Sequence, residues 1–529
     1  MAAKLDSGVI EAPEFFNFAR DVIGRWAAER PDAPALWCVD IEGRETLRLT
    51  FQQLAARAEA AAQVFRSHGL QPGDRVLVVL PRIPQWWIAM LGMIRAGVVP
   101  VPCPVQLTPG ELAYRAETAG ARGTITDSTH LSKLEGFVGI RFLIGESPGG
   151  WLDFEAEMKK HPEPFGGETT RGDAPGILYF TSATTGQPKM VLHTQASYGL
   201  GHRQTGELWL DLKPGDVHWN VSDLGWAKAA WSSLFGPWQM GACVFAADNR
   251  GKFLPHATLQ LLENFPITTW CAPPTALRLI IRENLASFRF PKLRHCVSAG
   301  EPLNPEIISL WQSATGLGIY EGYGQTETVV LIGNFRRLGH SPRAGSMGRA
   351  NPNFEIALLD EELRELPADS EGEIAIRLKP RRPLGLFREY WKNPAQNAAQ
   401  FRGDYYLTGD RARRDAEGCF WFVGRADDVI KSSGYRIGPA EVESVLLEHP
   451  SVLDVAVVGK PDALRGQLVK AFVVLRPGYE AGEHLAASLQ SHCREKAAPY
   501  KYPREIEFVP DLPKTTSGKI RRVELRARS

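Results

Sequence analysis

Short apolar runs rich in β-branched residues alternate with helix-length amphipathic segments along most of the chain. An apolar run at 76–80 is followed by a helical pattern at 86–94 and by a second apolar run at 98–102. The same order recurs, with strand-like runs at 242–246, 267–271 and 296–299 before helical patterns at 257–264, 275–283 and 305–314. This strand and helix alternation predicts an α/β fold with parallel sheets covered by helices.

The pattern changes near the end of the chain. After residue 387 the units become shorter, and residues 424–438 join the long first part to a compact terminal segment. We predict there a helix at 439–448, strands at 452–458 and 469–475, a helix at 483–496 and a strand at 505–509. The expected architecture is a large N-terminal domain of helix-covered sheets (1–426) and a small C-terminal α+β domain (427–529), with the boundary near Asp427.

Composition and charge exclude several classes of protein. The net charge is +1 without a long basic run, so nucleic acid is not an expected partner. The seven cysteines lie far apart, without the spacing of a zinc site or a disulfide framework. Neither a secretory signal nor an apolar run of membrane-spanning length is visible, so we expect a soluble protein located in the cytoplasm.

Candidate chemistry first appears at residues 179–189, where an apolar run at 177–180 leads into a segment rich in hydroxyl groups. Hydroxyl and backbone N–H groups, a glycine and a mobile lysine are suited to hold a polyphosphate. The candidates are Thr181, Ser182, Thr184, Thr185, Gly186 and Lys189. The spacing of a Walker A loop is absent, and a Ser/Thr-rich surface turn is the alternative interpretation. Gly300 and Tyr323 also follow strand-like runs, where ligands bind in parallel sheets.

Five segments occur in the order typical of one family: 179–189, Tyr-Gly-Gln-Thr-Glu-Thr at 323–328, Tyr-Leu-Thr-Gly-Asp at 406–410, 424–436 and 513–522. Together they resemble the adenylate-forming superfamily of acyl-CoA synthetases, peptide-synthetase adenylation domains and luciferases. The stretches 222–226, 425–430, 433–439 and 498–503 are most similar to medium-chain acyl-CoA synthetases.

The resemblance implies an ATP-dependent ligase that joins a carboxylic acid to coenzyme A through an acyl-adenylate, with Mg²⁺ as cofactor. A short- to medium-chain acid is expected, including branched or aromatic ones. An adenylating enzyme that loads a carrier protein is the first alternative. A luciferase-like monooxygenase and an inactive nucleotide-sensing relative are the others.

The same resemblance implies the residues that bind ATP or AMP. Thr326 would contact the α-phosphate and Glu327 the magnesium ion, whose preferred ligands are oxygen atoms. Tyr323 would stack on adenine, Asp410 would accept hydrogen bonds from the ribose and Arg425 would make a second ribose or phosphate contact. The other nucleotide residues would be Gly300, Glu301, Pro302, Glu321, Gly322 and Phe422. A helix cap at Glu327, a core position for Tyr323 and a simple turn at Asp410 are the alternatives.

Lys519 is, by resemblance, the lysine that reaches from the small mobile domain to the carboxylate and the α-phosphate. Its ammonium would stabilise developing negative charge there. A solvated lysine on a basic tail is the alternative. Because acylation would remove its charge, a lysine acetyltransferase and a deacetylase acting on Lys519 are expected partners. Asp427 matches the hinge about which the small domain turns.

The coenzyme A and acyl sites are also implied by resemblance. Residues 433–436 (Ser433, Gly434, Tyr435 and Arg436) would meet coenzyme A, and Trp226, Gly324 and Val329 would line the acyl pocket. The chain has Ala183 and Val329 where relatives commonly have glycine. Ala183 brings a methyl group close to the phosphates, and Val329 would narrow the acyl pocket. A monomer or a homodimer is expected.

Overall fold

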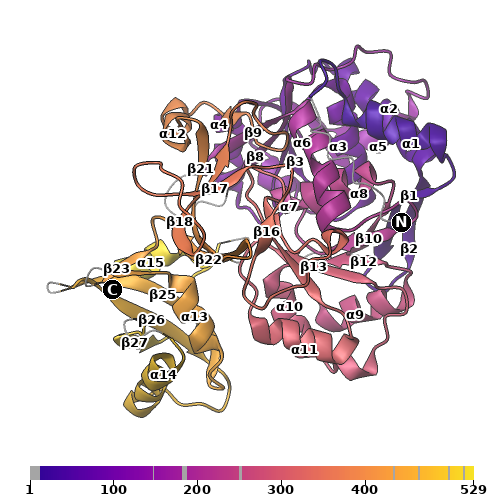
Figure 1. The fold of residues 1–529 in the computed structure, drawn as a ribbon. Coiled ribbons are helices and arrows are strands. Elements are labelled where there is room, and N and C mark those ends of the chain that lie inside the picture. Colours follow the sequence, from indigo (N-terminus) through magenta and orange to yellow (C-terminus); the bar gives the residue numbers. More distant parts are fainter. Residues whose placement is uncertain are drawn as a thin grey trace.

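The computed structural model describes residues 12–146, 148–181, 188–249, 253–432, 435–462, 465–497, 501–515 and 519–529. Figure 1 shows a large body that contains the N-terminal and central parts of the chain, with a smaller yellow C-terminal body beside it. The fold class predicted from the sequence, α/β with a large and a small domain, is confirmed. The exact boundary between the domains stays a prediction.

The largest sheet has fourteen strands within the described residues, and its central part is parallel. That part runs in the order β14 (Ile319–Tyr323), β13 (His295–Ala299), β12 (Thr269–Cys271), β10 (Val217–Asn220), β11 (Cys243–Asp248) and β1 (Pro34–Asp40), with β2 (Glu45–Thr50) antiparallel at its edge. The connecting helices are α9 (Pro255–Asn264), α10 (Pro274–Ile280) and α11 (Pro305–Thr315). The three strand and helix units predicted at 242–314 are therefore confirmed.

Beyond β14 the same sheet continues with antiparallel strands, which the sequence did not reveal individually. They are β15 (Ile332–Gly333), β16 (Gly348–Ala350), β22 (Cys419–Arg425), β21 (Tyr405–Arg414), β18 (Ser370–Arg377) and β17 (Ile356–Leu359), and β20 (Phe401–Arg402) pairs with β21. This extension matters for the site because it brings Asp410 opposite Arg425 in the β21 and β22 register.

A second sheet is fully parallel and contains the first predicted βαβ unit. Its order is β4 (Val99–Pro102), β3 (Arg75–Val79), β5 (Ala121–Asp127), β6 (Ile140–Ile144) and β7 (Leu152–Asp153). The helices of this region are α2 (Phe51–Ser67), α3 (Pro84–Ala96), α4 (Pro109–Ala119) and α5 (Phe154–Lys159). A Cβ atom on Gly92 of α3 would lie 2.4 Å from the Cβ of Ala61 in α2, so this glycine permits the two helices to pack closely.

A three-stranded antiparallel sheet carries the loop predicted to bind phosphate. β8 (Pro175–Phe180) pairs with β9 (Met190–Thr194), and β9 pairs with β19 (Glu389–Tyr390). The strand-like run at 177–180 was predicted as part of the parallel α/β pattern. Its pairing differs, because β8 runs antiparallel to β9 and α6 (Gln195–Gln204) begins only after β9.

The small domain has its own five-stranded sheet within the described residues. Its order is β24 (Tyr435–Ile437), β23 (Ile430–Ser432), β26 (Gly466–Leu475) and β25 (Val452–Asp462), and β27 (Glu505–Phe508) pairs in parallel with β26. The helices are α13 (Pro439–Leu447), α14 (Glu483–Lys496) and α15 (Arg522–Ala527). The helices and strands predicted for this segment are confirmed, whereas β23, β24 and α15 are additional.

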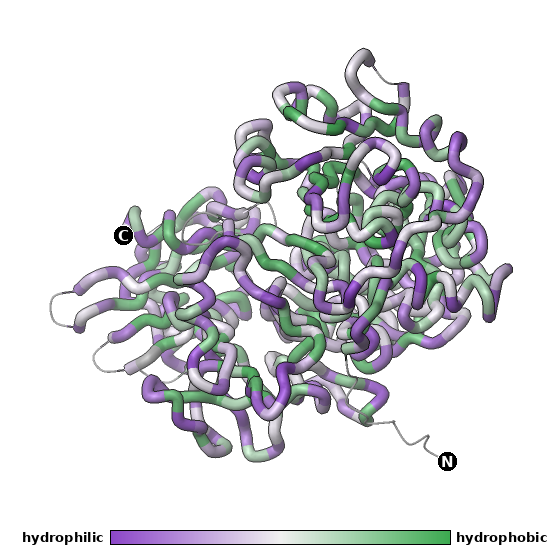
Figure 2. Tube along the Cα trace, turned by 90° about the horizontal axis from the view of Figure 1, so that it is seen from above, coloured by the Kyte–Doolittle hydropathy of each residue, from purple (hydrophilic) through white to green (hydrophobic). Residues whose placement is uncertain are grey.

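The remaining helical segments are short. They are η1 (Ala19–Ile23), α1 (Gly24–Glu29), η2 (Leu131–Leu134), η3 (Thr205–Trp209), α7 (Ala227–Ala229), η4 (Ala230–Leu234), α8 (Phe235–Gln239), η5 (Leu285–Ser287), η6 (Arg336–Leu338) and α12 (Pro394–Gln400). Figure 2 shows green hydrophobic segments concentrated inside the large body. Across the described stretches, no helix combines the length and apolar character needed to cross a bilayer. All seven cysteines are buried and free.

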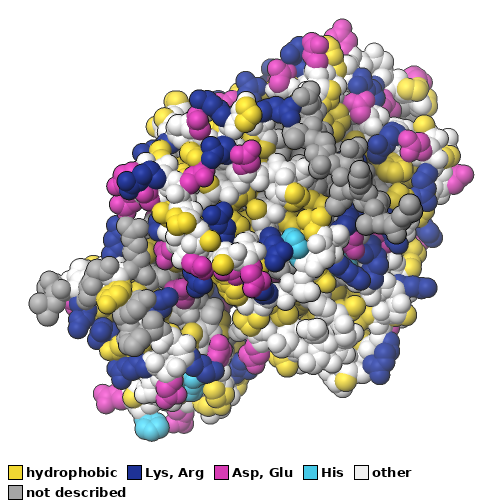
Figure 3. Space-filling model, in the orientation of Figure 1, with side chains coloured by type: hydrophobic (Ala, Val, Ile, Leu, Met, Phe, Trp, Pro, Cys, Tyr) yellow, Lys and Arg dark blue, Asp and Glu magenta, His cyan; other side chains and the backbone are white. Residues whose placement is uncertain are grey.

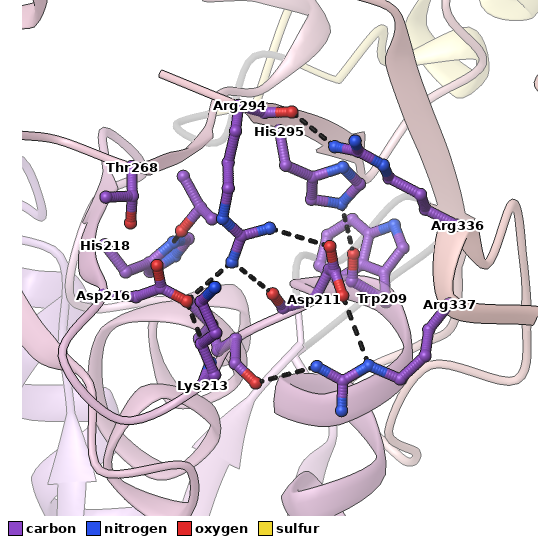
Figure 4. Close-up of polar contacts among 12 residues, drawn as sticks. Trp209, Asp211, Lys213, Asp216, His218, Thr268, Arg294, His295, Arg336 and Arg337 are labelled. Atoms are coloured by element: carbon purple, nitrogen blue, oxygen red, sulfur yellow. Dashed lines mark hydrogen bonds and ion pairs between the residues drawn. The ribbon is translucent and has the colours of Figure 1, made fainter. Parts of the chain in front are cut away.

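An ion-pair cluster fixes the amino-terminal edge of the parallel sheet (Figure 4). Arg294, just before β13, contacts Asp211 at 2.7 Å and Asp216, just before β10, at 2.6 Å. Arg337 of η6 contacts the same Asp211 at 3.3 Å. Because ligands of parallel sheets bind at the opposite, carboxyl edge, this cluster is part of the scaffold.

Candidate functional site

A cavity of about 470 Å³ lies at the carboxyl edge of the parallel sheet. Segments that follow β10, β13 and β14 form its walls, together with α7 and one residue of the small domain. Six residues predicted from the sequence line it: Trp226, Gly300, Glu301, Gly324, Thr326 and Lys519. The structure therefore brings together residues from four separate sequence motifs.

Thr326 lies in a turn whose backbone is held by two buried aromatic side chains. Its carbonyl accepts hydrogen bonds from His193 Nε2 at 2.8 Å and from the Tyr198 hydroxyl at 2.6 Å. The rings of His193 and Tyr198 stack with centroids 3.4 Å apart. Burial lowers the pKa of His193 to about 3, so the ring is neutral and donates from Nε2. This pair fixes the position of the turn at the cavity edge.

Glu327 is buried next to the cavity and is held by Tyr390 of β19. The Tyr390 hydroxyl donates to Glu327 Oε1 at 2.8 Å. Burial raises the pKa of Glu327, while this hydrogen bond and Lys189 lower it. The ammonium of Lys189 lies 5.4 Å from the centroid of the Tyr390 ring. Burial lowers the pKa of Lys189, and the charge of Glu327 opposes that effect.

Asp410 occupies a second polar position beside the cavity. Its Oδ2 accepts hydrogen bonds from the Tyr323 hydroxyl at 2.7 Å and from Gln325 Nε2 at 2.6 Å. Burial raises the pKa of Asp410, and these hydrogen bonds together with Arg425 lower it. Tyr323 is the last residue of β14 and directs its hydroxyl at Asp410.

A chain of hydrogen bonds connects Asp410 with Glu327. Gln325 lines the cavity and its Oε1 lies 3.3 Å from the Tyr406 hydroxyl. The Tyr406 hydroxyl lies 3.5 Å from that of Tyr390, which donates to Glu327. The two carboxylates are therefore parts of one buried polar network.

The segment 299–301 forms the wall on the other side. The Lys228 ammonium donates to the Ala299 carbonyl, and Arg278 pairs with Glu301 at 3.0 Å. Gly300 has φ +108°, a conformation that favours glycine. Behind the wall, Glu321 accepts a hydrogen bond from the Leu303 N–H at 3.1 Å, and burial raises its pKa to about 8.

Several residues predicted to bind the nucleotide lie outside the cavity lining. Glu321 faces the wall from behind, and a Cβ atom on Gly322 would lie 2.6 Å from the Trp209 ring. Phe422 lies in β22 and packs against the main hydrophobic core. Pro302, next to the wall, is exposed. These four are placed near the cavity but not on its surface.

Val329 is not among the residues that line the cavity. Its expected role in narrowing the acyl pocket stays a prediction, which the contacts of its side chain do not support. Its side chain is fully buried. A Cβ atom on Gly385 would lie 2.7 Å from Val329 Cγ2, and one on Gly201 would lie 3.3 Å from Val329 Cγ1. Val329 therefore packs against two glycines behind the site. Trp231 instead lies against Gly324, where a Cβ would be 2.4 Å from its ring.

Part of the predicted phosphate and coenzyme A sites falls outside the described residues. This applies to Ser182, Ala183, Thr184, Thr185, Gly186, Ser433 and Gly434, and to the side chain of Arg436. Thr181 and Lys189 close the hairpin, because the Thr181 N–H donates to the Lys189 carbonyl at 2.9 Å. Tyr435 is 51% exposed on β24.

Asp427 lies exposed in a turn between β22 and β23. Its carboxylate pairs with Arg425 at 2.9 Å. The following Asp428 is buried and pairs with Arg526 of α15 at 2.7 Å. The connection between the domains is thus tied to the helix that follows Lys519.

Sequence reasoning missed the residues that hold the catalytic candidates in place. His193, Tyr198, Tyr390 and Lys228 lie outside the motifs identified in the sequence, whereas Tyr406 begins the 406–410 motif but was not assigned a role. Gln325 had a signal, because it lies between two predicted residues of the 323–328 motif. Within the described part of the chain, no group of three or more His, Cys, Asp or Glu side chains could hold a metal ion.

Glu327 nevertheless fits the magnesium ion that the resemblance implies. It is a buried carboxylate that uses Oε1 for Tyr390, and its Oε2 has no hydrogen bond among the described residues. Mg²⁺ commonly binds one or two carboxylates together with phosphate oxygens and waters, so a single protein ligand beside a nucleotide is sufficient.

Comparisons with known proteins agree with this geometry. The AMP-binding enzyme family matches residues 23–391, and the AMP-binding enzyme C-terminal domain matches residues 441–519. Acyl-coenzyme A synthetase ACSM3, mitochondrial, of Mus musculus is 47% identical over 98% of this chain and 91% of its own length. Human acyl-coenzyme A synthetase ACSM5, mitochondrial, is 44% identical over 97% and 91%.

Solved structures show the same fold. The anthranilate CoA ligase AuaEII in complex with anthranoyl-AMP superposes with a TM-score of 0.88 at 29% identity, covering 98% of this chain and 99% of that one. A benzoate CoA ligase from Burkholderia xenovorans LB400 gives 0.83 at 30% identity, covering 97% and 100%. The chain therefore belongs to the AMP-binding enzyme family, among its acyl-coenzyme A synthetases.

Proposed function

We propose that this acyl-coenzyme A synthetase works in two half-reactions at the cavity described above. In the first, a carboxylate oxygen of the acid attacks the α-phosphorus of ATP and diphosphate leaves. In the second, the thiol of coenzyme A attacks the carbonyl carbon of the acyl-adenylate, loses its proton, and AMP leaves. The observation that carries the proposal is that Lys519 of the small domain lines the same cavity as Thr326, Gly300 and Trp226.

The residues at the cavity edge support the first half-reaction. Carboxylate and phosphate are both anionic, so their approach requires positive charge and in-line positioning. Lys519 is suited to neutralise both groups, and Thr326 to contact the α-phosphate from a turn that His193 and Tyr198 hold rigid. Bound beside Glu327, Mg²⁺ would neutralise phosphate charge. Asp410 would bind the ribose, with Tyr323 next to it.

The second half-reaction requires coenzyme A to reach the adenylate. We propose that the small domain turns about Asp427 after the first step, which would carry Lys519 away and bring residues 433–436 towards the site. The position of Asp427 in an exposed turn between β22 and β23 supports this proposal, because hinges are commonly loop residues whose backbone torsions change.

For the acid substrate we propose a chemical class and no individual compound. The apolar surfaces of Trp226 and Trp231 and the absence of a side chain at Gly324 suit a short- to medium-chain, branched or aromatic acyl group. The names of two structural relatives give anthranilate and benzoate for those proteins. These names support the inclusion of aromatic acids in the test.

A panel of straight, branched and aromatic acids tests the proposal. The protein is incubated with ATP, Mg²⁺ and coenzyme A, diphosphate release is followed, and the thioester is identified by mass spectrometry. We expect equimolar acyl-CoA, AMP and diphosphate for at least one acid. Adenylate that accumulates with coenzyme A and is consumed only by a carrier protein would instead favour the carrier-loading alternative.

Three further expectations belong with this proposal. Lys519 is exposed at the surface of the small domain, which supports acetylation and deacetylation as its control. Mass spectrometry of inactive, acetylated enzyme with Lys519 unmodified would contradict this.

Buried, free cysteines fit a reducing cytoplasm, although the two curated relatives are named mitochondrial. Cell fractionation would distinguish the two locations, and light scattering would distinguish a monomer from a homodimer.

A further inference from the structure

Lys228 is one of three cationic side chains that line the cavity, beside Arg82 and Lys519, and the reaction as proposed does not use it. It belongs to α7, two residues after Trp226, and lines the cavity together with Trp226, Ala227 and Trp231. Its ammonium donates to the Ala299 carbonyl. That carbonyl ends β13 and lies directly before Gly300, so Lys228 connects the acyl and nucleotide walls.

The Lys228 ammonium has more N–H donors than the protein provides acceptors for within the described residues. A lysine ammonium carries three N–H donors. Over the described ranges, Lys228 Nζ has the Ala299 carbonyl as its protein hydrogen-bond partner, and no carboxylate lies within 4 Å of it. Two donors therefore remain for a group inside the cavity. Burial lowers the pKa of Lys228, as expected for a cation that lacks a close counter-ion.

Apart from Lys519, the other charged side chains of the cavity wall already have protein partners. The Arg82 guanidinium donates to the Val221 carbonyl at 2.6 Å and to Asn249 Oδ1 at 2.7 Å. Glu301 pairs with Arg278 at 3.0 Å, and Asp223 accepts a hydrogen bond from Gln106 at 3.0 Å. Lys228 thus differs from its charged neighbours in offering donors to a ligand.

The position of Lys228 close to Trp226 indicates that the acid is the partner of its two remaining N–H donors. Lys228 follows Trp226 in the segment proposed to contact the acyl group, and it lies beside Gly300, where a Cβ atom would be 3.9 Å from Nζ. Lys519, which also lines the cavity, is available for the reacting carboxylate and the α-phosphate. A plain alkyl chain packed against Lys228 would remove its water without replacing the hydrogen bonds, which is costly for a charge.

We propose that Lys228 binds an oxygen acceptor on the acyl part of the acid, so that this enzyme prefers acids with a second oxygen function over unsubstituted acids of equal length. The inference rests on the proposed acyl-CoA ligase function and names its substrate class. The acceptor is a hydroxyl, a keto or a second carboxylate oxygen. Sites that hydrogen-bond a substrate group discriminate strongly against analogues that lack it.

Matched acids provide the test. The kcat/KM of diphosphate release is measured for hexanoate, 6-hydroxyhexanoate, 5-oxohexanoate and adipate, and for benzoate beside 3- and 4-hydroxybenzoate. We expect at least one oxygenated acid to exceed its unsubstituted partner by about tenfold or more. Preference for adipate would identify an anionic acceptor, and preference for the hydroxy or keto acid a neutral one.

The variant Lys228→Met keeps an unbranched side chain of nearly the same length and removes the donors. We expect it to lose the preference, because kcat/KM should fall much more for the oxygenated acid than for the unsubstituted acid. Lys292→Met, an exposed lysine before β13, is the matched control and should keep the wild-type preference. Melting temperatures of both variants check that they fold. The comparison of oxygenated with unsubstituted acids on the wild-type enzyme tests the proposal even if a variant does not fold.

Two results would overturn the role assigned to Lys228 and leave the proposed ligase function intact. The first is a wild-type enzyme that prefers every unsubstituted acid to its oxygenated partner. The second is a folded Lys228→Met variant that lowers kcat/KM for both kinds of acid equally, which would mean that Lys228 only supports the Ala299 wall. Absence of diphosphate release with every acid would overturn the proposed function and this assignment together.

Discussion

Glu321 shows how a single buried carboxyl group supports the cavity from behind. Burial raises its pKa from 4.5 to about 8, and its Oε1 accepts a hydrogen bond from the Leu303 N–H. The folded protein keeps this proton up to about pH 8, whereas the unfolded chain releases it near pH 4.5. The stability gained by burying the neutral acid is therefore complete below pH 4.5 and is lost as pH rises through 8.

We predict that Glu321→Gln weakens this pH dependence, because glutamine keeps the acceptor and has no proton to lose. The free energy of unfolding should fall less between pH 5 and pH 9 than in the wild type, by an amount on the order of 4 kcal/mol at most. Urea denaturation at pH 5, 7 and 9 measures it. Parallel curves for the two proteins would show that Glu321 does not titrate in this range.

Val329 gives a second prediction at the residue scale. It is fully buried against Gly385 and Gly201, so Val329→Ala should lower the free energy of unfolding by roughly 2 kcal/mol. Relative kcat/KM values over straight acids of increasing length should stay unchanged. A shift towards longer acids would mean that Val329 reaches the acyl pocket after all.

Site residues were predictable where the sequence places polar side chains in a recognisable order. Thr326, Glu327, Asp410 and Lys519 belong to such segments, and the structure groups them around one cavity and its edge. The supporting residue Tyr390 was not predictable, because its contact with Glu327 joins positions 63 residues apart. A hydrophobic pattern shows that such a side chain is buried but not which carboxylate it meets.

At the scale of elements, α15 determines where Lys519 lies. The helix begins three residues after Lys519, and its arginines are tied to the domain connection and to α13. Arg526 pairs with Asp428 at 2.7 Å, and Arg522 contacts both carboxylate oxygens of Glu443 at 2.8 Å. The Thr515 side chain also accepts a hydrogen bond from the Lys519 N–H at 3.1 Å.

We therefore predict that Asp428→Asn slows adenylate formation more than thioester formation, because it loosens the helix that carries Lys519. The reduction should be about tenfold, equivalent to roughly 1.4 kcal/mol. Rapid-quench measurements of each half-reaction provide the values. Glu524→Gln is the matched control, since it breaks an exposed pair with Arg521 on the same helix and should have little effect. Equal slowing of both steps by Asp428→Asn would contradict the coupling.

Helices and strands with a regular hydrophobic pattern were predicted well, whereas the direction in which strands pair was not. The sequence indicated α14 at 483–496 with the bounds found in the structure, and the βαβ units at 76–102 and 242–314 were found. The run at 177–180 was expected in a parallel sheet, whereas β8 pairs with β9 in the antiparallel direction. An apolar run of five or six residues has the same sequence pattern in a parallel and in an antiparallel sheet. The direction of pairing therefore depends on the partner strand and cannot be predicted from the run itself.

At the scale of the whole molecule, function depends on two domains that share one cavity. Basic and acidic side chains are interspersed on the face of the molecule in Figure 3. The large domain supplies Thr326, Gly300 and Trp226, and the small domain supplies Lys519. The central claim is that this arrangement serves adenylate formation, with a different domain orientation for the second step.

The most direct test of that claim is to measure the two half-reactions separately in the Lys519→Ala variant. Diphosphate release with acid and ATP is compared with thioester formation from supplied acyl-adenylate and coenzyme A. Because Lys519 would stabilise charge only while the carboxylate attacks ATP, we predict a loss of at least about 100-fold in the first rate and a change of less than about threefold in the second. Equal loss of both rates, or a wild-type rate of diphosphate release, would contradict the account.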